Sequence, residues 1–187
     1  MARSKVKPIA ARAFTVKSSR ISGRGVFAIR TISKGERLIE YVGERVSHGV
    51  ADARYDDSAM TNHHTFLFTV SRQTVIDASF GGDESRFINH SCDPNSETVI
   101  EKARVFIEAI RDIEAGEELS YDYGYARDGT ETPDEEFRLY GCRCGSLKCR
   151  GTILAPLSNA QLRKRAAATK ARHHPPHAHA RTARKEI

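Results

Sequence analysis

The sequence predicts a mainly β protein built from several small sheets, with few and short helices. From residue 14 to about residue 154, short runs of β-forming residues are separated by turn chemistry. The run "TFLFTV" at 65–70 alternates, which places Phe66, Phe68 and Val70 on one face. The runs "RLIEYV" and "ARVFIEAI" are similarly rich in β-formers.

A near-repeat supports the same fold class. "AIRTISKGERLIEYVG" (28–43) matches "AIRDIEAGEELSYDYG" (109–124) at an offset of 81 residues. Each copy predicts a strand, a turn in which Gly35 or Gly116 takes a positive φ, and a second strand. Two copies of one design predict small sheets with approximate internal symmetry, whereas a solenoid needs more copies.

One helix is expected over 47–60, with Ser47 as its N-cap, although Gly49 weakens it. The 187 residues, 39 % apolar and 29 % charged, suit one globular domain with a real core. No window approaches 18 consecutive apolar residues, so no membrane span is expected.

Charge is divided unevenly along the chain. Residues 1–20 carry six basic side chains and no acid, and residues 158–187 carry eight Lys/Arg and one Glu. Residues 21–157 hold 16 basic and 23 acidic side chains. The acidic body favours cationic ligands, and the basic ends suit nucleic acid or acidic surfaces. Solvated, disordered ends are the alternative, and an organelle transit peptide is a further interpretation of residues 1–20.

The four cysteines are unevenly distributed, with three of them in one short segment. Cys142, Cys144 and Cys149 form C-x-C-x4-C, and Cys92 lies about fifty residues earlier in "RFINHSCDPN". Three thiolates leave one position of a tetrahedral zinc site, and Cys92 is the remaining cysteine. A four-cysteine site would be structural, because catalytic zinc keeps an open position. The alternative is four unrelated buried or free thiols.

The sequence resembles the SET-domain family of protein lysine methyltransferases with a cysteine-rich post-SET segment. The resemblance is carried in order by "SGRGVFA" (22–28), "EYVGE" (40–44), "RFINHSCDPN" (86–95), "GEELSYDYG" (116–124) and "CRCGSLKCRG" (142–151). It implies a β-clip of several small sheets with a pseudoknot, few short helices and a zinc-bound post-SET segment. The cysteine-rich pre-SET region of some relatives is absent, since no cysteine precedes Cys92.

The resemblance also implies an organisation. We expect a basic N-terminal arm at 1–13, a SET domain at 14–126, a post-SET segment at 127–157 and a disordered basic tail at 158–187. The tail has almost no large apolar residues, so it cannot bury a core.

Two cofactors are implied, S-adenosyl-L-methionine and structural Zn²⁺. The glycines of "SGRGVF" would let backbone approach the methionyl end, and "RFINH" would form the wall beside it. The cofactor-binding residues implied are Gly23, Arg24, Gly25, Val26, Phe27, Arg86, Phe87, Asn89, His90 and Tyr123. The zinc ligands implied are Cys92, Cys142, Cys144 and Cys149.

The "SYDYG" run places Tyr121 and Tyr123 on one strand face. Tyr123 matches the family's catalytic tyrosine, and Tyr121 matches the position that tunes how many methyls fit. The lysine channel would be lined by Phe66, Phe68 and Tyr121. Phe66 departs from the family, because many relatives carry Tyr-x-Phe there. We expect mono- or dimethylation.

The implied function is S-adenosylmethionine-dependent methylation of lysine in basic protein segments, such as a histone tail or a DNA-associated protein. Acidic residues at 131 and 134–136 are candidates to meet basic residues of the substrate, or form a solvated loop. "ARTARK" and "RKRAAATKAR" in the tail resemble methylated histone tails, which makes Lys185 and Lys170 candidates for automethylation or pseudosubstrate control. The alternative is a chance match, because low-complexity Ala/Lys/Arg tracts produce such runs easily. The alternative is a catalytically weak SET-like protein that binds chromatin or DNA. The location would be cytoplasmic in a bacterium, with secretion into a host as an option, or nuclear in a eukaryote.

Overall fold

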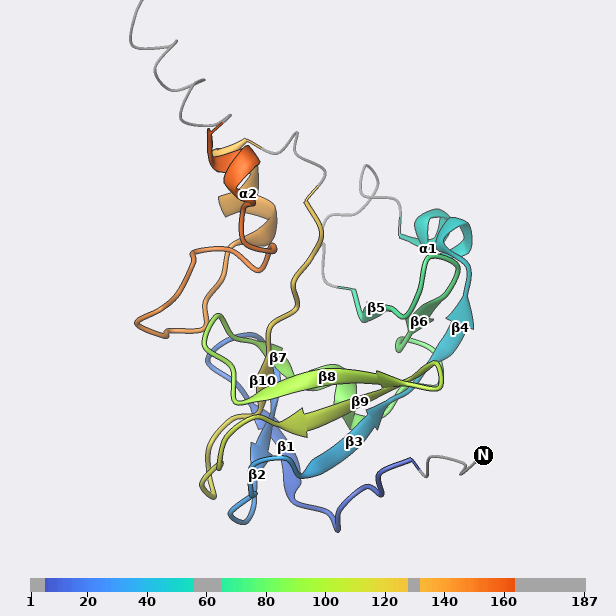
Figure 1. The fold of residues 1–187 in the computed structure, drawn as a ribbon, viewed down its shortest axis with the longest axis vertical. Coiled ribbons are helices and arrows are strands. Elements are labelled where there is room, and N and C mark those ends of the chain that lie inside the picture. Colours follow the sequence, from blue (N-terminus) through green and yellow to red (C-terminus); the bar gives the residue numbers. More distant parts are fainter. Residues whose placement is uncertain (1–5, 56–64, 128–131, 164–187) are drawn as a thin grey trace, which may run out of the picture.

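The computed structural model describes residues 6–55, 65–127 and 132–163 (Figure 1). Its strands are β1 (Phe14–Ser18), β2 (Arg24–Ala28), β3 (Arg37–Tyr41), β4 (Glu44–Val46), β5 (Leu67–Thr69), β6 (Val75–Asp77), β7 (Asn89–His90), β8 (Ser96–Glu101), β9 (Arg104–Ala109) and β10 (Ser120–Tyr121). Its labelled helices are α1 (His48–Arg54), the 3-10 turn η1 (Glu84–Phe87) and α2 (Pro133–Tyr140). Residues 159–163 are also helical, so this part of the expected disordered tail has regular structure. The mainly β prediction is confirmed.

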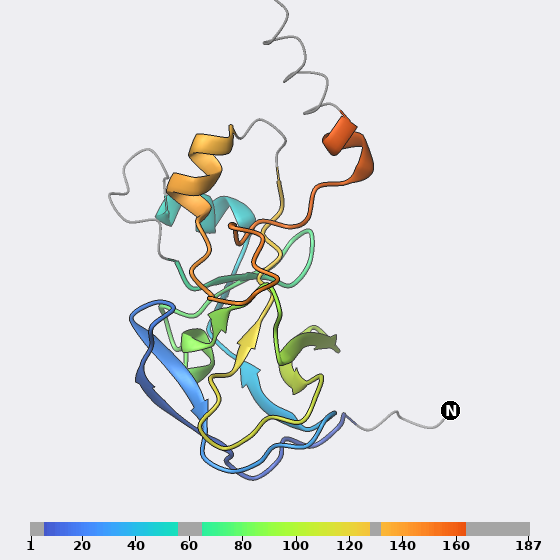
Figure 2. The same cartoon turned by 90° about the vertical axis from the view of Figure 1, so that its left-hand side faces the viewer.

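The strands form four small sheets. Antiparallel pairing builds β1–β2, β3–β9–β8 and β4–β6–β5, whereas β7 and β10 pair in parallel. Figures 1 and 2 both place α1 and α2 toward one end of the molecule, with the β3–β9–β8 sheet toward the other. Within the described ranges, no helix combines the length and apolar character needed to cross a bilayer.

Of the two labelled α-helices, α1 was predicted from the sequence and α2 was not. Ser47 caps α1, since its hydroxyl accepts from the Val50 N–H at 3.3 Å. Residues 56–60 of the expected helix lie outside the described residues. The helix α2 was missed, although "TPDE" carries the signal: Thr132 at the N-cap position, Pro133 at the first helical position and Glu three residues after the cap.

The near-repeat forms a local two-fold arrangement. Ile32 and Ile113 exchange both backbone hydrogen bonds at 2.9 Å. Gly35 N–H donates to the Ala109 carbonyl, and the equivalent Gly116 N–H donates to the Ala28 carbonyl. Gly35 and Gly116 have φ of 80° and 93°, so both turns need glycine. The predicted internal symmetry is therefore confirmed.

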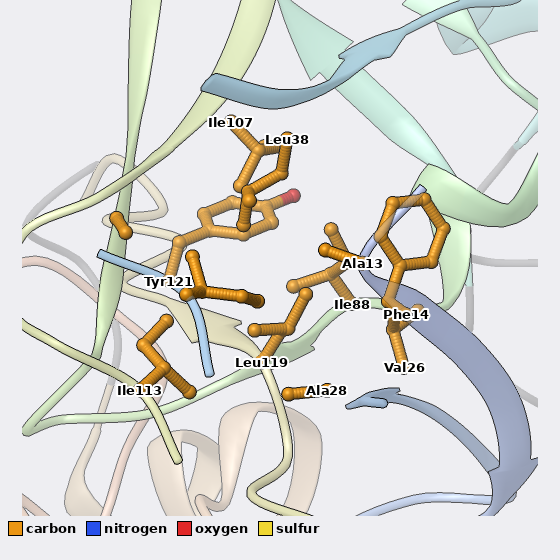
Figure 3. Close-up of a cluster of buried hydrophobic side chains, with 12 residues drawn as sticks. Ala13, Phe14, Val26, Ala28, Leu38, Ile88, Ile107, Ile113, Leu119 and Tyr121 are labelled. Carbon is orange, nitrogen blue, oxygen red and sulfur yellow. The ribbon is translucent and has the colours of Figure 1, made fainter. Parts of the chain in front are cut away.

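The larger hydrophobic core lies between these repeats and the β1–β2 hairpin (Figure 3). Val26, Ile32, Ile107, Ile113 and Leu119 are fully buried in it. Figure 3 shows the Tyr121 ring within this cluster, beside Leu38 and Ile107; Phe68, Phe87 and Tyr123 pack against its edge. The core therefore holds in place four aromatic side chains that the family resemblance assigns to the functional site: Phe68, Phe87, Tyr121 and Tyr123.

Distant segments meet around β7 and β10. Leu119 N–H donates to the Val26 carbonyl at 2.7 Å, and Ser91 N–H donates to the Tyr121 carbonyl at 3.2 Å. The Asn95 side chain joins the same region, since it donates to the Glu118 carbonyl and accepts from Ser120 N–H. The "SGRGVFA", "RFINHSCDPN" and "GEELSYDYG" runs thus lie side by side, as the expected SET fold requires.

Helix α1 is anchored through Asp77, which is fully buried. The Asp77 carboxylate accepts one hydrogen bond from the Arg54 guanidinium at 3.0 Å and one from the Tyr55 hydroxyl at 3.0 Å. Burial raises the pKa of Asp77, but these bonds outweigh it, so the net pKa lies below the usual range.

Arg37 of β3 is the most deeply buried cation among the described ion pairs, with 3 % of its side chain exposed. It pairs with Glu101 at 2.9 Å and Glu108 at 2.7 Å, and its guanidinium lies 4.0 Å above the Phe106 ring. It also donates to the Lys7 carbonyl, which ties the N-terminal arm to the sheet.

Arg37→Ala is expected to lower the free energy of unfolding by about 3–5 kcal/mol, because it leaves two carboxylates without their buried partner. Urea denaturation at pH 7 measures this. Arg104→Ala is the matched control, since Arg104 pairs with Glu40 on the same sheet but is 47 % exposed; little change is expected. Equal losses in the two variants would contradict the prediction.

Candidate functional site

One cavity of about 720 Å³ opens between the sheets and α1. Among the residues predicted from the sequence, those that line it are Gly23, Arg24, Phe66, Phe68, Arg86, Phe87, Asn89, Tyr121 and Tyr123. Gly25, Val26, Phe27 and His90 are not in this lining, and Val26 is fully buried in the core. Segments more than sixty residues apart in sequence therefore share one space.

Asn89 of β7 is held at the β2 end of the cavity. Its amide nitrogen donates to the Arg24 carbonyl at 2.9 Å and to the Glu118 carboxylate at 2.7 Å. Glu118 also accepts from the Ser19 hydroxyl at 2.9 Å. Sequence analysis missed Glu118 as the residue that orients Asn89, because the two are 29 residues apart and no local pattern links them.

Gly25 is required by this arrangement. A Cβ at residue 25 would lie 2.2 Å from Oε1 of Glu118 and 2.9 Å from the Ser19 Cβ. The close approach of β2 to Glu118 therefore depends on the absence of a side chain.

Gly25→Ala is expected to displace Glu118 and to weaken by tenfold or more the affinity for the S-adenosylmethionine that the family resemblance implies, since about 1.4 kcal/mol corresponds to a factor of ten. Calorimetric titration with S-adenosylhomocysteine measures this. Gly49→Ala is the control, because the added Cβ meets nothing within 4 Å. The interpretation is wrong if both variants bind as the unsubstituted protein does.

Two guanidinium groups mark the same end of the cavity. The Arg24 guanidinium lies 4.0 Å and the Arg86 guanidinium 4.8 Å from the Phe87 ring centroid. Arg86 donates to the Ala78 carbonyl at 3.0 Å, while its buried Nε has no hydrogen-bond partner among the described residues. This end of the cavity therefore suits an anionic group such as a carboxylate.

Tyrosines and phenylalanines also line the cavity, and Phe66 and Phe87 lie beside the guanidinium groups. The Tyr123 ring lies 5.0 Å from the Tyr121 ring and 5.9 Å from the Tyr125 ring, measured between centroids. The Tyr123 hydroxyl donates to the Ile88 carbonyl at 2.9 Å. Burial raises the pKa of Tyr123 and of Tyr121 above the ordinary value, so both hydroxyls stay protonated at neutral pH.

Two further tyrosines of this wall were missed. Tyr41 is 3 % exposed, and its hydroxyl donates to the Phe66 carbonyl at 3.0 Å. Tyr125 also lines the cavity; burial raises its pKa, while a hydrogen bond from Thr65 lowers it in part. The signal was present for both, because Tyr41 lies in the quoted "EYVGE" run and Tyr125 continues the alternation of Tyr121 and Tyr123.

The four cysteines form one cluster. Their sulfur atoms all lie within 4.8 Å of one another, and the Cys92 and Cys142 sulfurs are 3.7 Å apart. In a tetrahedral site with Zn–S bonds of about 2.3 Å, sulfurs are about 3.8 Å apart, so the donor set and spacing fit structural Zn²⁺. Neighbouring hydrogen bonds outweigh burial and lower the pKa of Cys144 to about 6, whereas burial raises the pKa of Cys92 and of Cys142 above the ordinary value.

His90 lies between the cluster and the tyrosine wall. Its Nδ1 accepts from the Tyr123 N–H at 3.1 Å, and its Nε2 is 3.3 Å from the Cys92 sulfur. Burial lowers the pKa of His90 to about 4, against a raising effect of Asp122. The ring is therefore neutral at pH 7, and its role is to accept one hydrogen bond and donate another.

Comparisons with known proteins agree with this geometry. The family described as SET domain matches residues 23–124. A histone-lysine N-methyltransferase, H3 lysine-4 specific, from Eremothecium gossypii is 45 % identical over 146 residues, which cover 74 % of this chain and 14 % of that protein. The protein of the same description from Saccharomyces cerevisiae is 43 % identical over 141 residues, covering 72 % of this chain and 12 % of that protein.

A solved structure is also similar. The crystal structure of the Chaetomium thermophilum polycomb repressive complex 2 superposes with a TM-score of 0.57 at 36 % identity, covering 62 % of this chain and 16 % of that chain. The chain thus spans about one seventh of the length of the curated relatives. The matched residues include Asn89, Cys92 and three tyrosines of the wall, Tyr41, Tyr121 and Tyr123, and the chain belongs to the SET-domain family.

Proposed function

We propose that the protein is a protein-lysine N-methyltransferase that uses S-adenosylmethionine. The observation that carries the proposal is the Tyr123 hydroxyl. It lines a cavity that also contains Asn89, two guanidinium groups and several aromatic side chains. Because its proton is donated to the Ile88 carbonyl, its oxygen lone pairs are free to accept from a reacting group.

Bound S-adenosylmethionine supplies an electrophilic methyl group on a sulfonium. Lysine must lose its proton before its amine attacks, which costs roughly 4 kcal/mol near pH 7.4. The aromatic wall lowers this cost, since a poorly solvated channel disfavours the ammonium. Aligning the amine with the methyl group can contribute about 7–11 kcal/mol of the barrier reduction. Tyr123 stays protonated at neutral pH, because burial raises its pKa, so no phenolate is present to take the lysine proton. We therefore assign it positioning and electrostatic stabilisation, with water accepting the proton.

The proposed substrate is a basic protein segment such as a histone tail, which would place the protein at chromatin. The acidic body and the histone-lysine descriptions of the relatives support this. Asp52 lines the cavity and is exposed, so it can meet a basic residue next to the target lysine. Glu136 is unsuited to this role because it is 8 % exposed and pairs with Arg127. Residue 131 lies outside the described residues.

Tyr121→Phe is expected to raise the highest methylation state by one methyl group, because losing the hydroxyl leaves room in the channel. Mass spectra of the methylated peptide at reaction completion measure this. Phe66→Tyr is the opposing variant: it restores the hydroxyl that many relatives carry and is expected to restrict the product. An unchanged product distribution for Tyr121→Phe would refute the assignment.

The decisive experiment combines the purified full chain with S-adenosylmethionine and a core-histone mixture. Peptide mapping then covers the histones and the protein itself, including the proposed self-substrates Lys170 and Lys185, which lie outside the described residues. Methyl on a protein lysine supports the proposal and counts the methyl groups. No transfer and no cofactor binding would refute it in favour of a binding role, for which DNA affinity that depends on the basic tail is the readout.

A further inference from the structure

Two contacts connect the cysteine cluster to the residues around Tyr123. The first is made by Arg150, which directly follows Cys149. Its guanidinium donates two hydrogen bonds of 2.8 Å to the two carboxylate oxygens of Asp122, the residue before Tyr123. Such a bidentate pair fixes orientation as well as distance.

The second contact runs through His90. The Tyr123 N–H donates to Nδ1, so in the neutral ring Nδ1 carries no proton and Nε2 carries it. The Nε2 atom lies 3.3 Å from the Cys92 sulfur, close enough for its N–H to donate to a thiolate. His90 is 3 % exposed and packs against the Tyr123 ring at 5.3 Å between centroids. One imidazole therefore contacts a candidate metal ligand and the backbone of the proposed catalytic residue.

Regular structure does not supply these restraints. Strand β10 ends at Tyr121, two residues before Tyr123, and Gly124 adopts a φ of 56° immediately after it. Tyr123 N–H bonds to an imidazole instead of a neighbouring strand. The backbone N–H of Tyr123 thus depends on the His90 side chain, and the neighbouring Asp122 is held by Arg150 of the cysteine segment.

We propose that His90 and the Arg150–Asp122 pair are positioning residues that link metal occupancy of the four-cysteine cluster to the placement of Tyr123. The inference rests on the proposed function for the role of Tyr123, but the link itself is a physical property of the fold. It predicts that losing the metal loosens Tyr123, and that altering His90 weakens the metal.

Two substitutions separate the functions of His90. His90→Asn places an amide near the position of Nδ1, so it keeps an acceptor for the Tyr123 N–H and loses the donor to Cys92. His90→Gln reaches the position of Nε2, so it keeps that donor and loses the acceptor. Lys148→Ala is the matched control: Lys148 pairs with Asp93 at 3.0 Å and joins the same two segments, but the pair is 74 % and 48 % exposed.

The first experiment measures zinc affinity of the full chain by competition with a chromogenic chelator. His90→Asn is expected to weaken zinc binding about 10–100-fold, as is usual when a partner of a metal ligand is removed. His90→Gln and Lys148→Ala are expected to change it less. Equal zinc affinity in His90→Asn and the unsubstituted protein, or an equal loss in Lys148→Ala, would overturn the proposal.

The second experiment follows amide hydrogen exchange of peptides that contain Tyr123, with zinc bound and after verified removal. Removal is expected to speed exchange there in the unsubstituted protein, and His90→Gln is expected to show fast exchange even with zinc bound. Unchanged exchange after metal loss would overturn the link. Neither readout requires methyl transfer, so an inactive but coupled protein would contradict only the proposed function. An active protein without coupling would contradict only this inference.

Discussion

Tyr123→Phe is expected to lower the kcat of methyl transfer by about 10²–10³-fold, the usual cost of removing one preorganised dipole from a reacting centre. The hydroxyl proton is committed to the Ile88 carbonyl, which aims the negative end of the O–H dipole into the cavity. A methyl group in transfer carries positive charge between sulfur and nitrogen, so this dipole acts most strongly in the transition state.

The measurement is a steady-state rate with saturating S-adenosylmethionine and a histone peptide. Cofactor affinity is expected to change little, since Tyr123→Phe leaves the Asn89 end of the cavity intact. Tyr55→Phe is the control, because it also removes a tyrosine hydroxyl that makes a hydrogen bond. That hydroxyl donates to Asp77, and neither residue lines the cavity. A kcat for Tyr123→Phe within tenfold of the unsubstituted protein would show that the hydroxyl does not act in the transition state.

Removal of metal is expected to abolish activity, to disorder about residues 137–154 and to leave the sheets folded. Structural zinc contributes about 10–16 kcal/mol in small finger peptides, more than a segment with so little buried apolar surface can replace. Cys149 and Leu147 are exposed, and Leu154 is the one residue of 142–154 in the buried hydrophobic core of the described chain. Ile107 and Phe106 of β9, in contrast, are fully buried, and Ile107 belongs to the larger hydrophobic core.

Hydrogen exchange and activity after dialysis against chelator test this prediction, with metal content verified by elemental analysis. Exchange is expected to accelerate in peptides of 141–151 and to stay slow in β3 and β9. Cys144→Ser is expected to reproduce the effect, whereas Ser146→Ala in the same segment is expected to leave it unchanged. A verified metal-free protein with full activity would refute the prediction, and so would loss of protection throughout the sheets.

Features that depend on local spacing were predictable from the sequence. Alternation located β5, and runs of β-forming residues located β3 and β9. The near-repeat indicated the two-fold turns at Gly35 and Gly116, and cysteine spacing with "RFINHSCDPN" indicated the cysteine cluster. These signals work because strand periodicity, turn conformation and ligand type are properties of short segments. The resemblance to the SET-domain family then supplied the arrangement of the segments, which periodicity alone does not contain.

Contacts between distant side chains were decided only by the tertiary structure. Glu118 orients Asn89, the Tyr41 hydroxyl reaches the Phe66 carbonyl, and Arg150 binds Asp122, with 25 to 29 residues between partners. Each partner is an ordinary polar residue in its own segment, so nothing local distinguishes it from a solvated one. The sequence by itself therefore determined most of the strands, the cysteines that cluster and the tyrosines proposed for catalysis. Folding determined which side chains hold them in place, because a hydrogen bond forms only where packing brings donor and acceptor within about 3 Å.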